Sequence, residues 1–158
     1  MKTNMKTKII AAAAALTTMF LSAPAKAEAP VSTQVLRQVL RLSRTGECFA
    51  CDLRGANLRG AHLIGVDLRN ANLTGANLEE ANLEGADLTG ADLQGANLSG
   101  AFINSTTLNK ADLTNANLSD SQLYSAQLED ATLIGANLSG ADIFDTSIGV
   151  GGESVEEE

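Results

Sequence analysis

The stretch Ala91-Asp92-Leu93-Gln94-Gly95-Ala96-Asn97-Leu98-Ser99-Gly100 holds two copies of a five-residue unit, A-(N/D)-L-x-x, that decides the fold. From Leu53 to Ile148 a Leu or Ile recurs at every fifth position, twenty times in succession, and seventeen of the twenty are Leu. Two residues before each one stands a small residue, which is Ala at fifteen of the twenty sites. Neither the helical period of 3.6 nor the strand period of 2 fits this pattern. A fixed period repeated so often predicts a solenoid.

The composition agrees with an elongated domain that has a thin core. Trp is absent, the chain has one Tyr, and Leu and Ala supply most of the apolar residues. Such a core must be built in similar thin layers, because no large side chains are available to fill a thick one. Thr106, Ser121 and Thr146 replace the small Ala, and we expect each hydroxyl to bond to a backbone carbonyl of its own coil.

Units such as Ala56-Asn57-Leu58-Arg59-Gly60, run in tandem, resemble the pentapeptide-repeat proteins over about a hundred of the 158 residues. The resemblance implies an all-β solenoid, a right-handed quadrilateral β-helix with four units per coil. The twenty units would then form about five coils within residues 48–150. It also implies that the central Leu and the small residue of each unit point inward and that the other three positions point outward.

The first 27 residues have the three parts of a secretory signal peptide. Lys2, Lys6 and Lys8 form a basic start, residues 9–21 an apolar stretch, and Ala25-Lys26-Ala27 a cleavage signal. We expect cleavage after Ala27 and export to a periplasm or a thylakoid lumen, without stable membrane insertion afterwards. The remaining chain has a charge of 7 − 19 = −12 because four lysines are lost. Phosphate binding needs clustered cations, so nucleic acid is not an expected partner.

Residues 28–47 contain a short amphipathic helix that we expect to cap the solenoid. Ser32 or Thr33 can begin it, Gly46 can end it, and the apolar residues Val35, Leu36, Val39 and Leu40 recur at helical spacing. Arg37, Arg41 and Arg44 lie on the other face, as in a membrane-surface helix. A cap is the favoured interpretation because a solenoid needs its first layer covered. At the other end, residues 151–158 predict a disordered acidic tail.

Cys48-Phe49-Ala50-Cys51 is the one motif with recognisable chemistry. Continuing the five-residue register backward places both thiols inward, so in an oxidising compartment they are expected to form a disulfide. Exported members of the family resemble this chain in having C-x-x-C at the opening of the first coil. A thioredoxin-like redox site would need a βαβ pattern, and a zinc site would need two more ligands. These two alternatives, together with free thiols, remain open but less favoured.

With four units per coil, outward residues twenty apart fall in columns. One column is asparagine throughout, and its amides are expected to form a ladder between coils: Asn57, Asn77, Asn97, Asn117 and Asn137. Another side carries the residues of a candidate protein-contact patch: His62, Ile64, Phe102, Tyr124 and Phe144. Outward aromatics are typical of contact sites, although they can also merely cover the coil edges.

The sequence predicts no enzyme, no cofactor and no metal site. The outward acids have no base beside them, and the single His belongs to no recognisable catalytic triad. The expected function is that of a non-catalytic exported scaffold or protein-binding module with an unknown protein partner. The alternative is a DNA mimic, because some family members resemble duplex DNA in shape and charge and bind DNA gyrase. The acidic charge favours that alternative, and the export signal opposes it.

Overall fold

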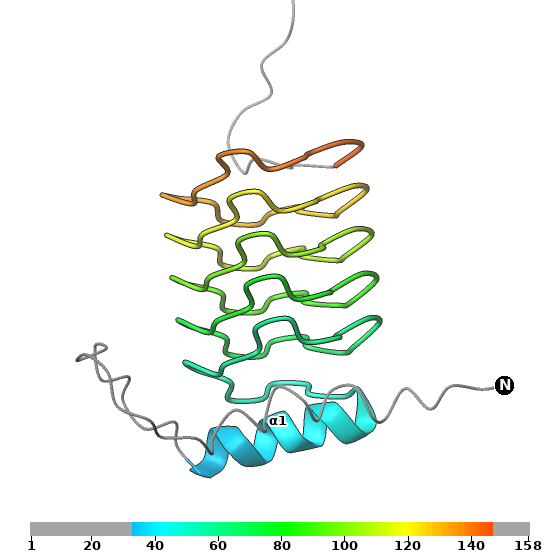
Figure 1. Ribbon diagram of the computed structural model, residues 1–158, viewed down its shortest axis with the longest axis vertical. Coiled ribbons are helices and arrows are strands. Elements are labelled where there is room, and N and C mark those ends of the chain that lie inside the picture. Colours follow the sequence, from blue (N-terminus) through cyan, green and yellow to red (C-terminus); the bar gives the residue numbers. More distant parts are fainter. Residues whose placement is uncertain (1–32, 147–158) are drawn as a thin grey trace, which may run out of the picture.

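The structure is a computed structural model that describes residues 33–146. The expected signal peptide, the expected acidic tail and the last central residue of the repeats, Ile148, lie outside the described residues. Within them the chain forms one helix, α1 (Thr33–Thr45), followed by a stack of coils. Helix α1 lies across one end of the stack, and the coils follow one another from that end to the other (Figure 1).

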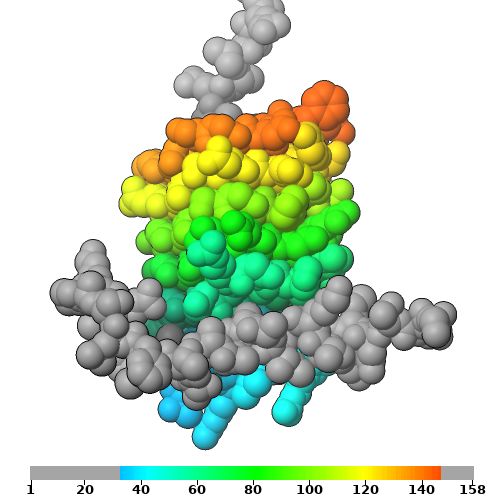
Figure 2. Space-filling model, in the orientation of Figure 1, coloured from blue at the N-terminus to red at the C-terminus, as the bar shows by residue number. Residues whose placement is uncertain are grey.

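The coils advance by twenty residues, which is four five-residue units. Sixteen parallel β-bridges join residues twenty apart, from Glu47 with Asp67 to Gln122 with Asp142. Residues 47–146 therefore make 100/20 = five turns of the chain. The space-filling view shows these turns as successive bands packed against one another (Figure 2).

The described residues contain isolated bridges rather than extended strands, which differs from the plain expectation of an all-β solenoid. The reason lies in the unit itself. Around Asn77, for example, the Leu58 N–H donates to the Asn77 carbonyl and the Asn77 N–H donates to the Ala56 carbonyl. The chain then turns within the same unit, so only one residue per side completes a bridge. A strand ladder needs consecutive bridges, and here every side is too short for a second.

The interior is built from the central Leu and the small residue of each unit, as the sequence predicts. These positions are buried from Cys48 to Leu128. The Thr106 hydroxyl donates to the Leu83 carbonyl at 2.7 Å and the Ser121 hydroxyl to the Leu118 carbonyl at 2.6 Å. Thr146 donates to the carbonyl of Leu123. The prediction that each hydroxyl bonds within its own coil is correct for Ser121. For Thr106 and Thr146 the main acceptor lies 23 residues earlier, in the preceding coil.

The preferred residues at the second and fifth positions of the unit have local causes. At the second position an Asn or Asp oxygen accepts from the N–H two residues on, as from Thr74 to Asn72 at 3.0 Å. This bond stabilises the turn that follows it. At the fifth position the backbone is left-handed in unit after unit, with φ of 62° at Gly95 and 61° at Lys110. Glycine adopts this conformation without strain, which explains why it is common there.

Helix α1 covers the first coil with a different set of residues from the one predicted. Val35 and Leu42 are buried and Val39 is partly buried against the core, whereas Leu36 and Leu40 are exposed. The buried set follows the spacing i, i+4, i+7, and it therefore excludes Leu36 and Leu40 from the inner face. The helix ends as predicted at Gly46, which has a φ of 70° and donates its N–H to the Leu42 carbonyl.

Candidate functional site

One side of the stack, residues 62–65, 82–85, 102–105, 122–125 and 142–145, is called here the aromatic side. Parallel bridges join its second positions in the order His62, Asn82, Phe102, Gln122 and Asp142. The fourth positions form the neighbouring column, in which the Ser105 N–H donates to the Tyr124 carbonyl and the Ser125 N–H to the Phe144 carbonyl. All five residues predicted as a contact patch are on this side.

The structure divides the predicted patch into two groups. His62 and Ile64 belong to one coil, and the polar pair Asn82 and Glu84 of the next coil separates them from the rest. Phe102, Tyr124 and Phe144 occupy three successive coils, with exposed fractions of 40%, 37% and 70%. Neighbouring coils lie about 4.8 Å apart, which brings the three aromatic rings within one contact area. The candidate site is therefore these three residues rather than all five.

Hydrogen bonds hold Tyr124 to the coils on both sides of it. Its hydroxyl donates to the Asp142 carboxylate, and its backbone N–H donates to Asn104 Oδ1 at 3.0 Å. The bond to Asp142 raises the pKa of the Tyr124 phenol, because losing that proton would leave two negative charges together. The two hydrogen bonds thus hold the ring in one orientation, which lowers the entropy that a partner would have to overcome on binding.

The contact between Tyr124 and Asp142 makes a direct prediction. Since the chain has one Tyr and no Trp, the phenolate absorbance reports Tyr124 alone. We expect its pKa to lie above the ordinary tyrosine value and to fall toward that value in Asp142→Asn, which removes the negative charge. Asp145→Asn is the matched control, since Asp145 contacts Ser125 instead. Identical titration curves for wild type and Asp142→Asn would contradict the contact.

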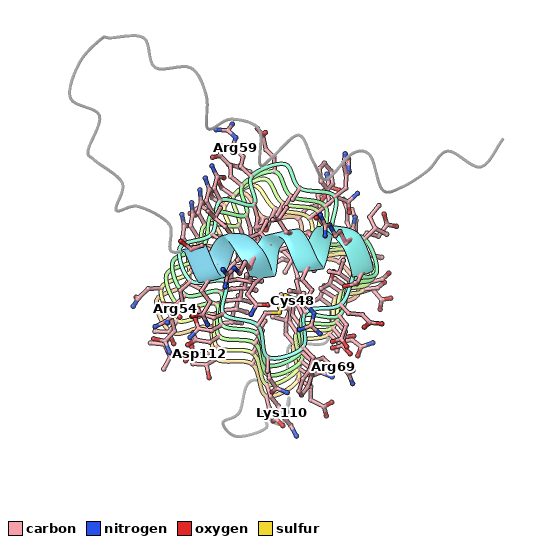
Figure 3. All side chains as sticks on the ribbon, turned by 90° about the horizontal axis from the view of Figure 1, so that it is seen from below. Cys48, Arg54, Arg59, Arg69, Lys110 and Asp112 are labelled. Carbon is pink, nitrogen blue, oxygen red and sulfur yellow. A yellow bond between two sulfur atoms is a disulfide. The ribbon has the colours of Figure 1, made fainter. Side chains whose placement is uncertain are left out.

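The aromatic side differs from the other three sides in its charge. It carries Glu84, Asp142 and Asp145 and has no Lys or Arg. In the first two coils each of the other sides carries one arginine: Arg54, Arg59 and Arg69 (Figure 3). Each of these arginines contacts a carboxylate, such as Arg54 with Asp52 at 2.8 Å. A cation approaching the stack would meet no like charge on the aromatic side.

One further aromatic contact, which the repeat pattern does not indicate, lies on another side. Phe49 is exposed on the side that begins with the bridge between Glu47 and Asp67. The Arg69 guanidinium lies over its ring at 5.7 Å from the centroid, a cation–π contact. Phe49 thus has a partner inside the molecule. No comparable cation contact covers Phe102, Tyr124 or Phe144 within the described residues.

Cys48 and Cys51 both face the interior beneath α1. Their Sγ atoms are 2.07 Å apart, at bonding distance for a disulfide, and both residues are buried. The Cys51 Sγ lies 3.2 Å from Gln38 Oε1 of the helix. The pair therefore lies where the helix meets the first coil (Figure 3). This burial fits a structural bond better than a redox site, which needs an accessible sulfur.

We expect the two cysteines to be bonded in the protein isolated from its host. Mass spectrometry without reduction should find an intact mass lower by two hydrogen atoms than after reduction. Alkylation before reduction should label neither residue. Labelling of both thiols in unreduced protein would refute the disulfide.

The asparagine column forms the predicted ladder over most of its length. Nδ2 of Asn117 donates to Asn97 at 3.1 Å, and Nδ2 of Asn137 donates to Asn117 at 3.0 Å. Asn97 reaches Asn77 at 3.5 Å, but no such bond joins Asn77 to Asn57 within the described residues. Each ladder oxygen also accepts from the N–H two residues on in its own coil, as from Ser99 to Asn97. The side-chain amides of Asn97, Asn117 and Asn137 thus both donate and accept within the stack, which favours a structural role.

The described residues do not bring together the parts of a catalytic or metal centre. His62 is exposed, and no hydrogen bond or ion pair joins its side chain to another described residue. Between residues 33 and 146 no cluster of three or more His, Cys, Asp or Glu side chains could hold a metal ion. Hydrogen bonds from Arg54, Arg69 and Thr114 lower the pKa values of Asp52, Asp67 and Asp112, so these carboxylates are poor proton donors.

The repeat region matches the family model described as pentapeptide repeats, in residues 51–90, 91–128 and 111–148. Together the matches span 148 − 51 + 1 = 98 of the 158 residues. Among curated proteins, none matches the chain.

Several solved structures are similar to the chain. One is the pentapeptide repeat protein Rfr23 from the cyanobacterium Cyanothece 51142, with 27% identity, 70% of this chain and 97% of that chain covered, and a TM-score of 0.58. Another is QnrB1, a plasmid-mediated fluoroquinolone resistance protein, which is 26% identical. The match covers 63% of this chain and 62% of that chain, with a TM-score of 0.50. A pentapeptide repeat protein from the Arabidopsis thaliana thylakoid lumen is 29% identical, with 73% of this chain and 69% of that chain covered and a TM-score of 0.41.

Proposed function

The chain belongs to the pentapeptide-repeat family, and on that premise we propose that it is a non-catalytic scaffold or protein-binding module that acts outside the cytoplasm, in a periplasm or a thylakoid lumen. Family membership implies a right-handed quadrilateral β-helix, whose flat sides are rigid and repetitive. The observation that carries the proposal is the row formed by Phe102, Tyr124 and Phe144 in three successive coils. Aromatic residues exposed together are enriched at protein interfaces.

The chemistry of the aromatic side favours a partner with apolar and basic residues. The three rings offer apolar area, and their faces attract cations. Asp142 and Asp145 provide negative charge beside Phe144, and the described residues of that side include no Lys or Arg to compete. The corresponding columns on the asparagine side hold only polar or charged residues and no aromatic ring, which supports the choice of the aromatic side.

The expected compartment rests on the predicted signal peptide, residues 1–27. We expect the protein in its host to begin near Glu28 and to fractionate outside the cytoplasm. N-terminal sequencing of the native protein checks the cleavage, and fractionation checks the compartment. A native protein that still carries Met1 and remains in the cytoplasm would overturn this part of the proposal.

The DNA-mimic alternative draws support from one observation, the charge of the later coils. Residues 70–146 contain one cation and eleven acids, a net charge of 1 − 11 = −10. A mimic would act on a cytoplasmic gyrase-type enzyme, so it conflicts with export. A DNA supercoiling assay with gyrase separates the two functions: inhibition by the purified protein would favour the mimic, and unchanged supercoiling favours the binding module.

The binding proposal is tested by chemical crosslinking and capture from the exported fraction of the host. We expect one specific partner to be recovered with the wild-type chain and to perturb the fluorescence of the single tyrosine, Tyr124, on binding. A partner that binds without changing the Tyr124 signal would place the contact on another side of the stack.

A further inference from the structure

Helix α1 has a second face that the capping role does not use. Its inner face packs on the first coil through Val35 and Leu42. On the outer face, Leu36 and Leu40 are exposed at 39% and 47%, and all three arginines of the helix are exposed. This outer face is defined by Leu36, Arg37, Leu40, Arg41 and Arg44. A helix that only covered a coil would need polar residues there, not leucines one turn apart.

Among the described residues, the arginines of α1 differ from the other arginines in having no acidic partner. Arg59 contacts Glu79 at 3.2 Å, and Arg54 and Arg69 each contact an Asp of their own coil. By contrast, Arg37, Arg41 and Arg44 form no ion pair with any residue between 33 and 146. Their charge is therefore available to a ligand beyond the end of the stack.

Charge is also unevenly distributed along the axis of the stack. Residues 33–69 hold six cations and three acids, a net charge of 6 − 3 = +3. Residues 70–146 have a net charge of −10, as given above. The described part of the chain is thus positive at the α1 end and negative over the later coils. An anionic surface would attract the α1 end and repel the coils.

We propose that the outer face of α1 docks on an anionic membrane surface, with the stack standing upright on it. Helix α1 lies flat across the end of the stack, so a plane can touch it along its whole length (Figures 1 and 3). Exposed leucines on such a helix enter the boundary between headgroups and acyl chains, and guanidinium groups bind lipid phosphates. The attachment is peripheral: no helix between residues 33 and 146 is long and apolar enough to cross a bilayer.

A second copy of the chain is the competing occupant, because its acidic end would also attract α1. One observation favours the membrane. Leu36 and Leu40 lie one turn apart on the exposed side of a helix, so both can enter a fluid interface at the same depth. This proposal is independent of the aromatic side and of its partner.

The test is cosedimentation with lipid vesicles, using the chain in the form that the host makes. Vesicles of phosphatidylcholine alone are compared with vesicles that contain phosphatidylcholine and phosphatidylglycerol in a three to one ratio. We expect binding only to the second kind, reversed by salt because screening weakens charge attraction. The triple variant Arg37→Gln/Arg41→Gln/Arg44→Gln should lower the partition coefficient roughly a hundredfold. Leu36→Ser/Leu40→Ser should also weaken binding. The factor by which it weakens binding should vary less with salt than the factor for the arginine variant, because the leucines contribute apolar rather than charge attraction.

Arg54→Gln/Arg59→Gln/Arg69→Gln is the matched control, because it removes the same charge from paired arginines of the first two coils. Vesicle binding should survive in this variant. Equal losses in both triple variants would mean that net charge alone drives binding, and would overturn a site on α1. Absence of vesicle binding by the wild type would also overturn the proposal. If that absence came with salt-sensitive oligomers that the α1 variant abolishes, the occupant would be a second copy.

Discussion

Leu98→Ala is expected to lower the free energy of unfolding by about 2–5 kcal/mol, the largest stability loss for a single truncation in the stack. Leu98 is 1% exposed in a middle coil, with a buried Leu directly before it and another directly after it in its column, Leu78 and Leu118. Truncation leaves a cavity that these neighbours cannot fill, because the hydrogen bonds between coils fix the backbone around them. Urea unfolding followed by circular dichroism measures the loss.

Leu138→Ala is the matched control for Leu98→Ala. Leu138 lies in the same column two coils later and is only partly buried. We expect less than half the loss of Leu98→Ala, since a side chain that is already partly exposed leaves less apolar area uncovered. Equal losses for the two variants would show that the last described coil is as well covered as a middle one.

The second large effect concerns binding. Phe102→Asn/Tyr124→Asn is expected to weaken capture of the partner roughly thirtyfold or more, because aromatic side chains dominate interface energies. The stack should remain folded, with a change in stability of about 0.5 kcal/mol or less. The second position of the unit commonly holds Asn, and at residue 102 its oxygen can accept from the N–H of Asn104, as the other asparagines do. Quantitative capture and thermal unfolding measure the two effects.

Asn97→Ser is the converse control for the aromatic double variant. It removes the ladder bonds to Asn77 and Asn117, which should cost about 1 kcal/mol of stability. Partner capture should be unchanged, since the asparagine column is on another side. Loss of the partner in Asn97→Ser, with full capture by the aromatic variant, would place the contact on the asparagine side instead.

The five-residue repeat in the sequence is enough to predict most of the fold. The period of five shows which residues face inward, and the burial of the central Leu and small residues from Cys48 to Leu128 follows it. The placement of both cysteines inward follows from the same register. Contacts between coils were harder to predict. The Thr106 hydroxyl donates to the carbonyl of Leu83, in the preceding coil. The offset between successive coils decides which carbonyl is in reach, and the five-residue period does not give this offset.

Two further features depend on geometry that the residue pattern does not contain. Gln122 lacks the short side chain that would accept from the N–H of Tyr124, and Asn104 of the preceding coil accepts from it instead. Helix α1 shows an apolar pattern wide enough to bury either Leu36 or Leu42, and only contact with the first coil selects Leu42. For the candidate site, the columns correctly placed all five residues on one side. The separation of His62 and Ile64 from the three aromatics follows from the intervening coil.

Photocrosslinking from single positions tests the central claim most directly. Phe144 and Ser139 are both exposed, occupy the fourth position of their units and belong to the same coil, but they lie on adjacent sides. A benzophenone amino acid replaces one or the other, and the protein is irradiated in the exported fraction. The account predicts a specific adduct from position 144 and none from position 139. Adducts from 139 alone, or equal adducts from both, would contradict binding through the aromatic side.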